Sequence, residues 1–231
     1  MTMNAKNEKA VGVMSKAGAY FGYTKTRRHP STNPFILTSR NKADIIDPNK
    51  ITESLEKAKA FVKSLAKDGK KILFVATKPE AKNVLIQSAV GLEMPYVTER
   101  WVGGIITNFP EIRKRISRFL ELKDDKAKGE LVKYTKKERL LLDKEIERLQ
   151  KYFSGISTLT KIPDAIFVVD SKKEHIAVAE AQKANIPVIS ISNTDCDIRG
   201  ITYPIVGNDT SSTSISFFVG EIAKAYLEGK Q

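Results

Sequence analysis

The sequence predicts an α/β fold in which helices cover both faces of a parallel sheet and an antiparallel helical hairpin is inserted. Two observations lead to this prediction. Short, nearly continuous apolar runs alternate with helical stretches over residues 71–97 and 164–206, which is typical of strand–helix–strand units with right-handed crossovers. Between these regions, residues 111–152 are highly charged and contain narrow apolar stripes at helical spacing.

The first predicted helix begins after residue 46. Asp47 suits the N-cap, Pro48 suits the first helical position, and Gly69 suits a left-handed end. The apolar residues between them recur at spacings of three and four, which indicates one buried helical face; they are Ile51, Leu55, Ala58, Val62 and Leu65.

The first predicted strand covers residues 71–76, an apolar run suited to a buried parallel strand. We expect Thr77 to cap a helix over residues 79–90. Residues 96–97 predict a second, weaker strand.

The strongest strand signal is the apolar run inside residues 164–170. A helix is expected over about residues 173–184, followed by a strand over residues 186–192. Residues 201–206 predict one more strand, and residues 212–227 predict a closing helix.

The inserted segment contains two apolar stripes separated by a polar link over residues 124–134, which includes Gly129. This pattern predicts an antiparallel coiled-coil hairpin. The stripes consist of Ile112, Ile116, Phe119 and Leu120, and of Leu142, Ile146, Leu149 and Phe153. We therefore divide the chain into a basic N-terminal arm (1–46), an α/β domain (47–110 and 154–231) and the hairpin (111–153).

Positive charge is concentrated in two segments. The 231 residues contain 39 Lys+Arg and 27 Asp+Glu, a net charge of +12. Residues 1–50 contribute +6 and residues 111–152 contribute +5, which leaves +1 for the rest. A nearly neutral body with two basic appendages favours a polyanion such as nucleic acid, although solvated lysines are also common on helical surfaces.

Composition excludes several other classes of site. Cys196 is the single cysteine, so no intramolecular disulfide or multi-cysteine zinc site can form, and His29 and His175 are too few for a histidine metal cluster. We expect no metal and no cofactor. Residues 1–16 lack the apolar core of a signal peptide, and no apolar run reaches the roughly 20 residues that span a bilayer. We therefore expect a soluble, cytoplasmic protein.

An enzyme acting on a phosphorylated or nucleotide ligand is the alternative. Its candidate positions are Thr77–Lys78 and residues 170–173, which follow predicted strands. However, neither glycine-rich phosphate loop is present, and an aspartate at position 170 is more often a cap. His175 is expected at a helix start, and the acidic neighbours of Cys196 disfavour its thiolate.

Two further segments suggest binding. Residues 20–30 interleave aromatic and basic side chains in a turn-rich stretch, which suits contacts with bases and phosphates or, alternatively, anchors the arm. Residues 99–109 place Trp101 beside Arg100 and a glycine pair. That arrangement is equally consistent with a binding loop and with a buried tryptophan at the root of the hairpin.

A series of separated motifs covers nearly the whole chain, from about residue 10 to 228. The motifs are GAYFGY (18–23), TRR (26–28), NPFI (33–36), RN (40–41), IID (45–47), ILFVATK (72–78), PYV (95–97), RWVGG (100–104), TN (107–108), KKE (136–138), PDA (163–165), EHIA (174–177), IPV (186–188) and GND (207–209). In this order, the motifs resemble those of the bacterial-type uS2 family of small-subunit ribosomal proteins.

The resemblance implies a flavodoxin-like (Rossmann-like) α/β domain with an inserted coiled-coil hairpin. It also implies a non-catalytic protein that binds small-subunit ribosomal RNA (rRNA) and neighbouring proteins between the head and body of the subunit, with a docking place for ribosomal protein S1 in many bacteria. This chain departs from the family at Tyr20 and Tyr23, where relatives commonly have histidine. Tyrosine cannot become a cation, so any role of those imidazoles, including metal coordination, is in doubt here.

The sequence therefore predicts a structural constituent of a bacterial or organellar ribosome, with no membrane partner and no independent homo-oligomer. Ten side chains are candidates for contacting rRNA, mostly at phosphates. They are Lys25, Arg27, Arg28, His29, Arg40, Arg100, Trp101, Arg113, Lys114 and Arg118.

Overall fold

The computed structural model describes residues 12–230, and its centre is a five-stranded parallel sheet. The strands lie in the order β5-β4-β6-β7-β8, which is the 2-1-3-4-5 order of flavodoxin-like folds when counted along the α/β region. The flavodoxin-like prediction is therefore confirmed. The strands are β4 (Ile72–Val75), β5 (Tyr96–Val97), β6 (Ala165–Val169), β7 (Val188–Ser192) and β8 (Tyr203–Val206).

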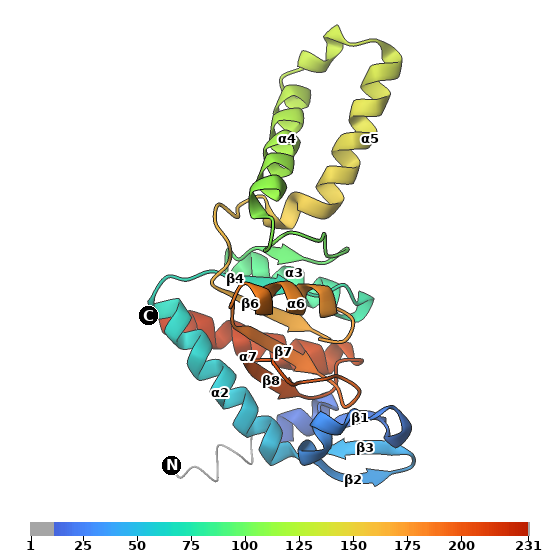
Figure 1. Cartoon of the computed structure of the whole chain (residues 1–231), viewed down its shortest axis with the longest axis vertical. Helices are drawn as coiled ribbons and strands as arrows, with labels where there is room; N and C mark the ends of the chain where they lie inside the picture. Colours follow the sequence, from blue (N-terminus) through green and yellow to red (C-terminus); the bar gives the residue numbers. More distant parts are fainter. Residues whose placement is uncertain (1–11, 231) are drawn as a thin grey trace.

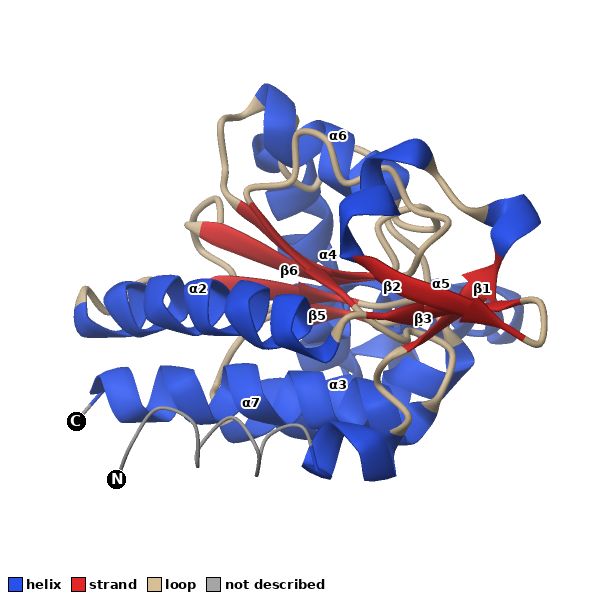
Figure 2. Ribbon diagram, turned by 90° about the horizontal axis from the view of Figure 1, so that it is seen from below, coloured by secondary structure: helices blue, strands red, loops and turns tan. Residues whose placement is uncertain are grey.

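Helices lie on both faces of this sheet. Figure 2 shows α2 (Pro48–Lys67), α3 (Pro79–Gly91) and α7 (Ser212–Lys230) along one face, with α6 (His175–Lys183) on the opposite side. Among residues 12–230, no helix is both long enough and apolar enough to cross a membrane.

The strand sequences are apolar throughout because both faces are buried. Along β4, Ile72 and Phe74 pack into the core beneath α2, α3 and α7, whereas Leu73 and Val75 pack into a second core beneath α6 and the base of the hairpin. Phe74 pairs in register with Phe167 of β6, and their rings lie 5.3 Å apart.

The expected helix after residue 46 is present as α2. The Asp47 carboxylate accepts a hydrogen bond from the Asn49 N–H at 2.9 Å, all five predicted stripe residues are buried, and Gly69 has a φ of 63° beyond the end. The prediction for Thr77 was wrong. Lys78 occupies the N-cap position of α3, and Thr77 instead donates its N–H to Glu174 at 2.9 Å.

Two long helices project from one end of the body, as Figure 1 shows at the top of the view. They are α4 (Phe109–Ala127) and α5 (Lys136–Phe153), joined through the short helix η3 (Glu130–Lys133). Thr135 and Glu138 form a reciprocal capping box at the start of α5. The coiled-coil character of this pair and the domain limits stay predictions.

The apolar stripes of this hairpin differ from the prediction in two places. Leu120 is exposed, and Leu122 is the buried residue instead. The link is also more structured than expected, because α4 continues to Ala127 and η3 buries Leu131 against the seam. The helix continues because, after Pro110 in its first turn, α4 meets no further proline or glycine before Gly129.

The N-terminal segment forms a small antiparallel sheet that the sequence did not predict. Its strands are β1 (Phe21–Thr24), β2 (Ile36–Arg40) and β3 (Ala43–Ile46), in the order β1-β3-β2, with η1 (Lys25–Arg27) and η2 (Pro30–Phe35) between the first two. Figure 1 shows it at the end of the molecule opposite the hairpin. The predicted arm begins at residue 1, outside the described residues.

Long-range backbone contacts hold this sheet against the body. The His29 N–H donates to the Thr194 carbonyl at 2.8 Å, and the Tyr23 N–H donates to the Thr194 hydroxyl at 2.9 Å. The Asn208 N–H donates to the carbonyl of Ala19 at 2.8 Å. Such partners are distant in sequence, so no local pattern could indicate them.

Candidate nucleic-acid interface

The N-terminal candidates separate into exposed cations and structural anchors. Lys25 and Arg27 are exposed on η1, and Arg40 is exposed at the end of β2. The Arg27 guanidinium lies 5.7 Å from the centre of the Tyr23 ring, a cation–π distance. These three side chains remain accessible to a polyanion.

Arg28 is tied into the small sheet. Its Nε donates to Asp44 Oδ2 at 2.7 Å, its Nη2 donates to Asp44 Oδ1 at 2.5 Å, and Nη2 also reaches the Ser39 hydroxyl at 2.9 Å. Asp44 is buried on β3, and the hydrogen bonds from Arg28 hold the pKa of its carboxyl below the usual value. Arg28 therefore neutralises a buried acid.

His29 also has local partners. Its Nδ1 accepts a hydrogen bond from the Ser31 N–H at 3.3 Å, at the start of η2. The same nitrogen lies 3.8 Å from a carboxylate oxygen of Asp197. His29 is partly buried and serves the turn that joins this segment to the body.

Glu180 anchors the loop that leads into the hairpin. This buried carboxylate on α6 accepts hydrogen bonds from the Trp101 indole, from the backbone N–H groups of Gly104, Ile106 and Thr107, and from the Thr107 hydroxyl, at 2.8–3.2 Å. Burial raises the pKa of Glu180, but these donors outweigh burial and hold it below its usual value.

The anchoring decides between the two interpretations of residues 99–109. Trp101 is only 6% exposed, its ring packs in the core at the wall of the groove described next, and its N–H donates to Glu180, which favours the structural interpretation. Arg100, one residue earlier, is exposed. Gly104 has a φ of 94°, a left-handed backbone conformation that glycine adopts without steric cost.

A groove of about 730 Å³ lies where this loop meets the bases of α4 and α5. Its lining contains five cations and two acids: Arg100, Lys114, Arg115, Arg118 and Arg148, with Glu111 and Glu145. The excess of three positive charges in one groove gives this part of the surface a positive potential that attracts anions.

The predicted hairpin residues lie differently with respect to this groove. Lys114 and Arg118 line it, with Lys114 Nζ 2.6 Å from Glu111 and Arg118 Nε 3.9 Å from Glu145. Arg113 instead donates to the Leu159 carbonyl at 2.9 Å and secures the segment that follows α5.

Sequence reasoning missed Arg115, Arg148 and Tyr152, which also line the groove. Among the described residues, neither Arg115 nor Arg148 forms an ion pair with a carboxylate. Helical spacing could have indicated these residues. Arg115 and Arg118 are three positions apart, and Arg148 and Tyr152 are four apart, so each pair lies on one face of its helix. Their convergence required the packing of α4 against α5.

The alternative enzyme site lies at the carboxyl edge of the parallel sheet. Lys78 Nζ lies 2.6 Å from Asp170 and 2.7 Å from Asp209, between the ends of β4, β6 and β8. Burial disfavours its charge, but the two carboxylates outweigh burial and raise the Lys78 pKa. The ion pairs therefore occupy the strand-end crevice where flavodoxin-like folds bind ligands.

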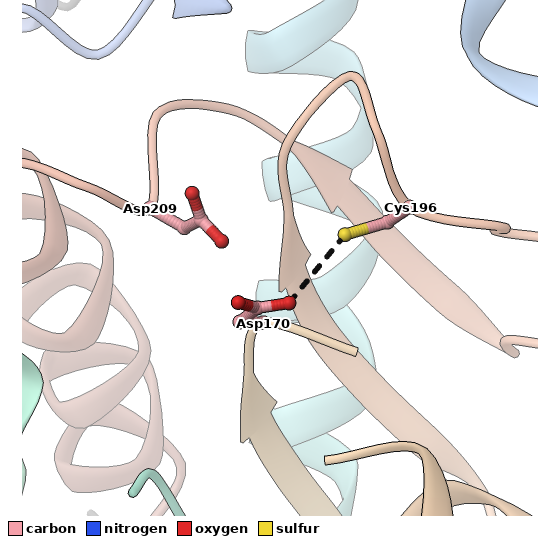
Figure 3. Close-up of side chains that lie close together, drawn as sticks. All are labelled: Asp170, Cys196 and Asp209. Carbon is pink, nitrogen blue, oxygen red and sulfur yellow. Dashed lines mark hydrogen bonds between the residues drawn. The ribbon is translucent and has the colours of Figure 1, made fainter. Parts of the chain in front are cut away.

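Figure 3 shows Asp170, Cys196 and Asp209 close together at this edge. The Cys196 thiol donates to Asp170 at 3.7 Å, and burial together with the neighbouring Asp170 raises its pKa to about 12. Asp170 accepts hydrogen bonds from the N–H groups of Lys172 and Lys173 in the turn before α6, but Glu174 occupies the N-cap position of that helix, so the expectation that Asp170 caps it was wrong. Lys78 supplies the positive charge that the two buried carboxylates require.

The two tyrosines that depart from the family pattern lie beside this edge. Tyr20 packs against the core and against Phe21, with ring centres 4.5 Å apart. Tyr23 is partly buried, and burial followed by the charge of Asp209 raises the pKa of its hydroxyl. The Tyr23 hydroxyl is therefore neutral at physiological pH, and neither tyrosine can provide a cationic contact.

Comparison with known proteins identifies the family. The family model described as "Ribosomal protein S2" matches residues 14–229. The chain belongs to the uS2 family of small-subunit ribosomal proteins.

Three curated relatives called "Small ribosomal subunit protein uS2" support this assignment over the full length. The proteins from Roseiflexus sp. (strain RS-1) and Roseiflexus castenholzii are each 40% identical over 230 residues, which cover 100% of this chain and 88% of the relative. The protein from Coprothermobacter proteolyticus is 41% identical over 216 residues, covering 94% of this chain and 81% of the relative.

Membership of the uS2 family makes the protein a structural component of the small ribosomal subunit, with a role in translation and without enzymatic activity. The alternative of an α/β enzyme is therefore wrong. The strand-end residues that suggested an enzyme, Lys78 and Asp170, form an ion pair with each other instead.

Proposed function

We propose that this uS2 protein binds small-subunit rRNA through two basic surfaces on opposite sides of its α/β body. The observation that carries the proposal is the groove at the hairpin base, where Arg115 and Arg148 face solvent without a carboxylate partner among the described residues. An unpaired guanidinium needs no internal ion pair to be broken before it binds a phosphate.

The second surface is the exposed part of the N-terminal segment, formed by Lys25, Arg27 and Arg40. Arg28 and His29 stabilise this surface through their hydrogen bonds with Asp44 and Ser31, which hold η1 and η2 in place. Because the small sheet and the hairpin lie at opposite ends of the body, the protein is suited to bridging two parts of a large RNA (Figure 1).

The resemblance to the family extends the proposal to a position between the head and body of the subunit, next to other ribosomal proteins and with a docking place for ribosomal protein S1. The protein S1 content of small subunits that contain or lack this protein tests that last part. Equal content in both preparations would remove it from the proposal.

The rRNA contact is tested with the variant Arg115→Ala/Arg148→Ala. We expect weaker binding to purified small-subunit rRNA and, if each arginine contacts one phosphate on a duplex, a salt dependence of log K that is shallower by about 1.8. The variant Lys57→Ala/Lys67→Ala removes the same charge from exposed positions on α2 and serves as the control.

The two variants must behave differently for the proposal to stand. Equal loss in both would indicate a general effect of net charge, and unchanged binding in the arginine variant would remove the groove from the interface. Sedimentation of cell extracts provides the second test, because the wild-type protein should migrate with small subunits rather than remain in the supernatant.

A further inference from the structure

The groove at the base of the hairpin combines positive charge with apolar surface. Besides its charged residues, it is lined by five apolar side chains, which we call the apolar lining: Trp101, Val102, Leu149, Tyr152 and Phe153. These side chains are buried or partly buried, whereas all five cations that line the groove are exposed. A ligand that enters the groove therefore meets positive charge at its edges and apolar surface deeper inside.

Three of the five cations are available to a ligand. The two acids of the groove are each paired with one of its cations, with Lys114 at 2.6 Å and with Arg118 at 3.9 Å. Within residues 12–230, the other three cations form no ion pair with a carboxylate; they are Arg100, Arg115 and Arg148. All three are arginines, whose planar guanidinium binds phosphate with two hydrogen bonds and also stacks on flat rings.

Tyr152 presents the most accessible aromatic ring of the apolar lining. Trp101 and Phe153 are only 6% and 3% exposed, whereas Tyr152 is only partly buried. Lys151 Nζ lies 5.9 Å from the centre of the Tyr152 ring, at the outer limit of a cation–π contact, so a ligand can displace it at small cost. Arg148 precedes Tyr152 by four positions, which places the guanidinium and the ring on the same face of α5.

These surfaces distinguish between paired and unpaired RNA. A duplex keeps its bases stacked inside and presents phosphates and sugars, which would use the arginines and leave the Tyr152 ring without a contact. An unpaired nucleotide offers a flat base as well as its phosphates, and such bases stack on aromatic side chains. The volume of about 730 Å³ falls within the range of about 300–1,000 Å³ typical of sites for small ligands, so an extruded nucleotide can enter.

We propose that the groove holds an unpaired nucleotide of the rRNA, with its base stacked on the Tyr152 ring and its flanking phosphates on Arg115 and Arg148. This inference rests on the proposed function, which brings rRNA to the groove. The combination of a planar ring with guanidinium groups favours a nucleotide over an acidic protein segment, whose carboxylates would use the arginines alone. The groove thus selects the structure of the RNA as well as its charge.

Substitution of the ring tests the stacking contact. Tyr152→Leu keeps an apolar side chain against the core but removes the aromatic plane, and circular dichroism checks that the fold is retained. We expect about tenfold weaker binding to purified small-subunit rRNA at every salt concentration, with an unchanged salt dependence of log K, because no charge is removed. Tyr152→Phe keeps the ring and should restore the affinity.

Tyr134→Leu is the matched control. It removes an exposed tyrosine from the segment between α4 and α5, outside the groove lining, and should not change the affinity for rRNA. Equal losses in Tyr134→Leu and Tyr152→Leu would overturn the inference. An equal loss in Tyr152→Phe would also overturn it, because the contact would then belong to the hydroxyl group rather than to the ring.

Ultraviolet irradiation of purified small subunits provides the direct test, because it joins a base to an aromatic side chain on which the base is stacked. We expect mass spectrometry to find a nucleotide attached to Tyr152, and chemical probing of subunits that lack this protein to show that nucleotide unpaired. An adduct with a base-paired nucleotide, or no adduct at Tyr152 in subunits that contain the protein, would overturn the inference.

The variants also separate this inference from the proposed function. If Tyr152→Leu binds naked rRNA like the wild type while Arg115→Ala/Arg148→Ala binds more weakly, the stacking contact is disproved and the rRNA proposal stands. If Tyr152→Leu binds naked rRNA normally but is lost from assembled subunits, the ring contacts a protein and the inference is also overturned. If neither variant weakens binding to rRNA, the groove is not an rRNA site and the proposed function itself fails there.

Discussion

The indole N–H of Trp101 donates to the carboxylate of Glu180 at 3.0 Å, joining the root of the hairpin to helix α6 across 79 positions of sequence. The other carboxylate oxygen of Glu180 accepts the N–H groups of Ile106 and Thr107. One buried side chain therefore determines where α4 leaves the body, and with it the position of the basic groove.

Replacing Glu180 with glutamine should loosen this root. The amide nitrogen of Gln cannot accept a hydrogen bond, so at least two of the five donors lose their acceptor, and we expect a loss of about 3 kcal/mol in unfolding free energy. Chemical denaturation measures the loss, and hydrogen exchange should accelerate at residues 104–107. Glu147→Gln, at an exposed position on α5, is the control and should change neither. Wild-type exchange at residues 104–107 in Glu180→Gln would contradict the anchoring role.

The Arg28–Asp44 pair should make stability depend on acid pH. The pKa of Asp44 is held below its ordinary 3.8, chiefly by hydrogen bonds from Arg28. The stabilisation of the folded protein by the ionised Asp44 carboxylate is therefore complete above pH 3.8, and it is lost as the pH falls through the lower pKa of the folded state. Asp44→Asn should cost about 3 kcal/mol at neutral pH, at the low end for a buried pair because Arg28 is partly exposed.

Urea denaturation of the wild type and of Asp44→Asn at several pH values tests this dependence. The difference between the two proteins should be constant from pH 7 to 5 and should shrink below 3.8. If the difference in unfolding free energy between the two proteins grew on acidification, the pKa of Asp44 would be raised by folding rather than lowered.

Gly155 should not tolerate a side chain. It lies in η4 (Ser154–Ile156), where a Cβ would come within 2.3 Å of the Tyr96 carbonyl oxygen, a backbone atom of β5 that cannot move freely. We expect Gly155→Ala to destabilise the protein by about 2–3 kcal/mol.

Gly91 is the matched control for this substitution. It ends α3 with open space around its Cα, so Gly91→Ala should stabilise the protein slightly, by about 0.5–1 kcal/mol. Thermal unfolding distinguishes the two variants, and similar shifts in Tm would disprove the steric argument.

Cys196 should be unreactive in the folded protein. With its pKa raised to about 12 by burial and by Asp170, only about one thiol in ten thousand is a thiolate at pH 8. Ellman's reagent should react slowly with the native protein and rapidly after unfolding in guanidinium chloride. Rapid reaction of the native protein would contradict the burial of this thiol.

Many of the elements were predictable from local pattern because their apolar spacing and capping residues act over a few positions. The stripe of α2 and the continuous apolar runs of β4 and β6 are examples. Thr77 was assigned wrongly because a threonine before a helix resembles a cap, while its actual partner, Glu174, is 97 residues away. The N-terminal strands escaped prediction because β1 and β2 are short and contain no buried residue, so they lack the apolar pattern that indicates a strand.

For the candidate site, the sequence by itself determined the family, the fold class and the two segments that contain the excess positive charge. Only the tertiary structure decided which cations remain accessible. It placed Arg28 on Asp44 and Trp101 on Glu180, and it brought Arg115 and Arg148 into one groove. The reason is physical: net charge and helical spacing are local sums, whereas the neutralisation of a side chain depends on which distant groups the fold brings within hydrogen-bond reach.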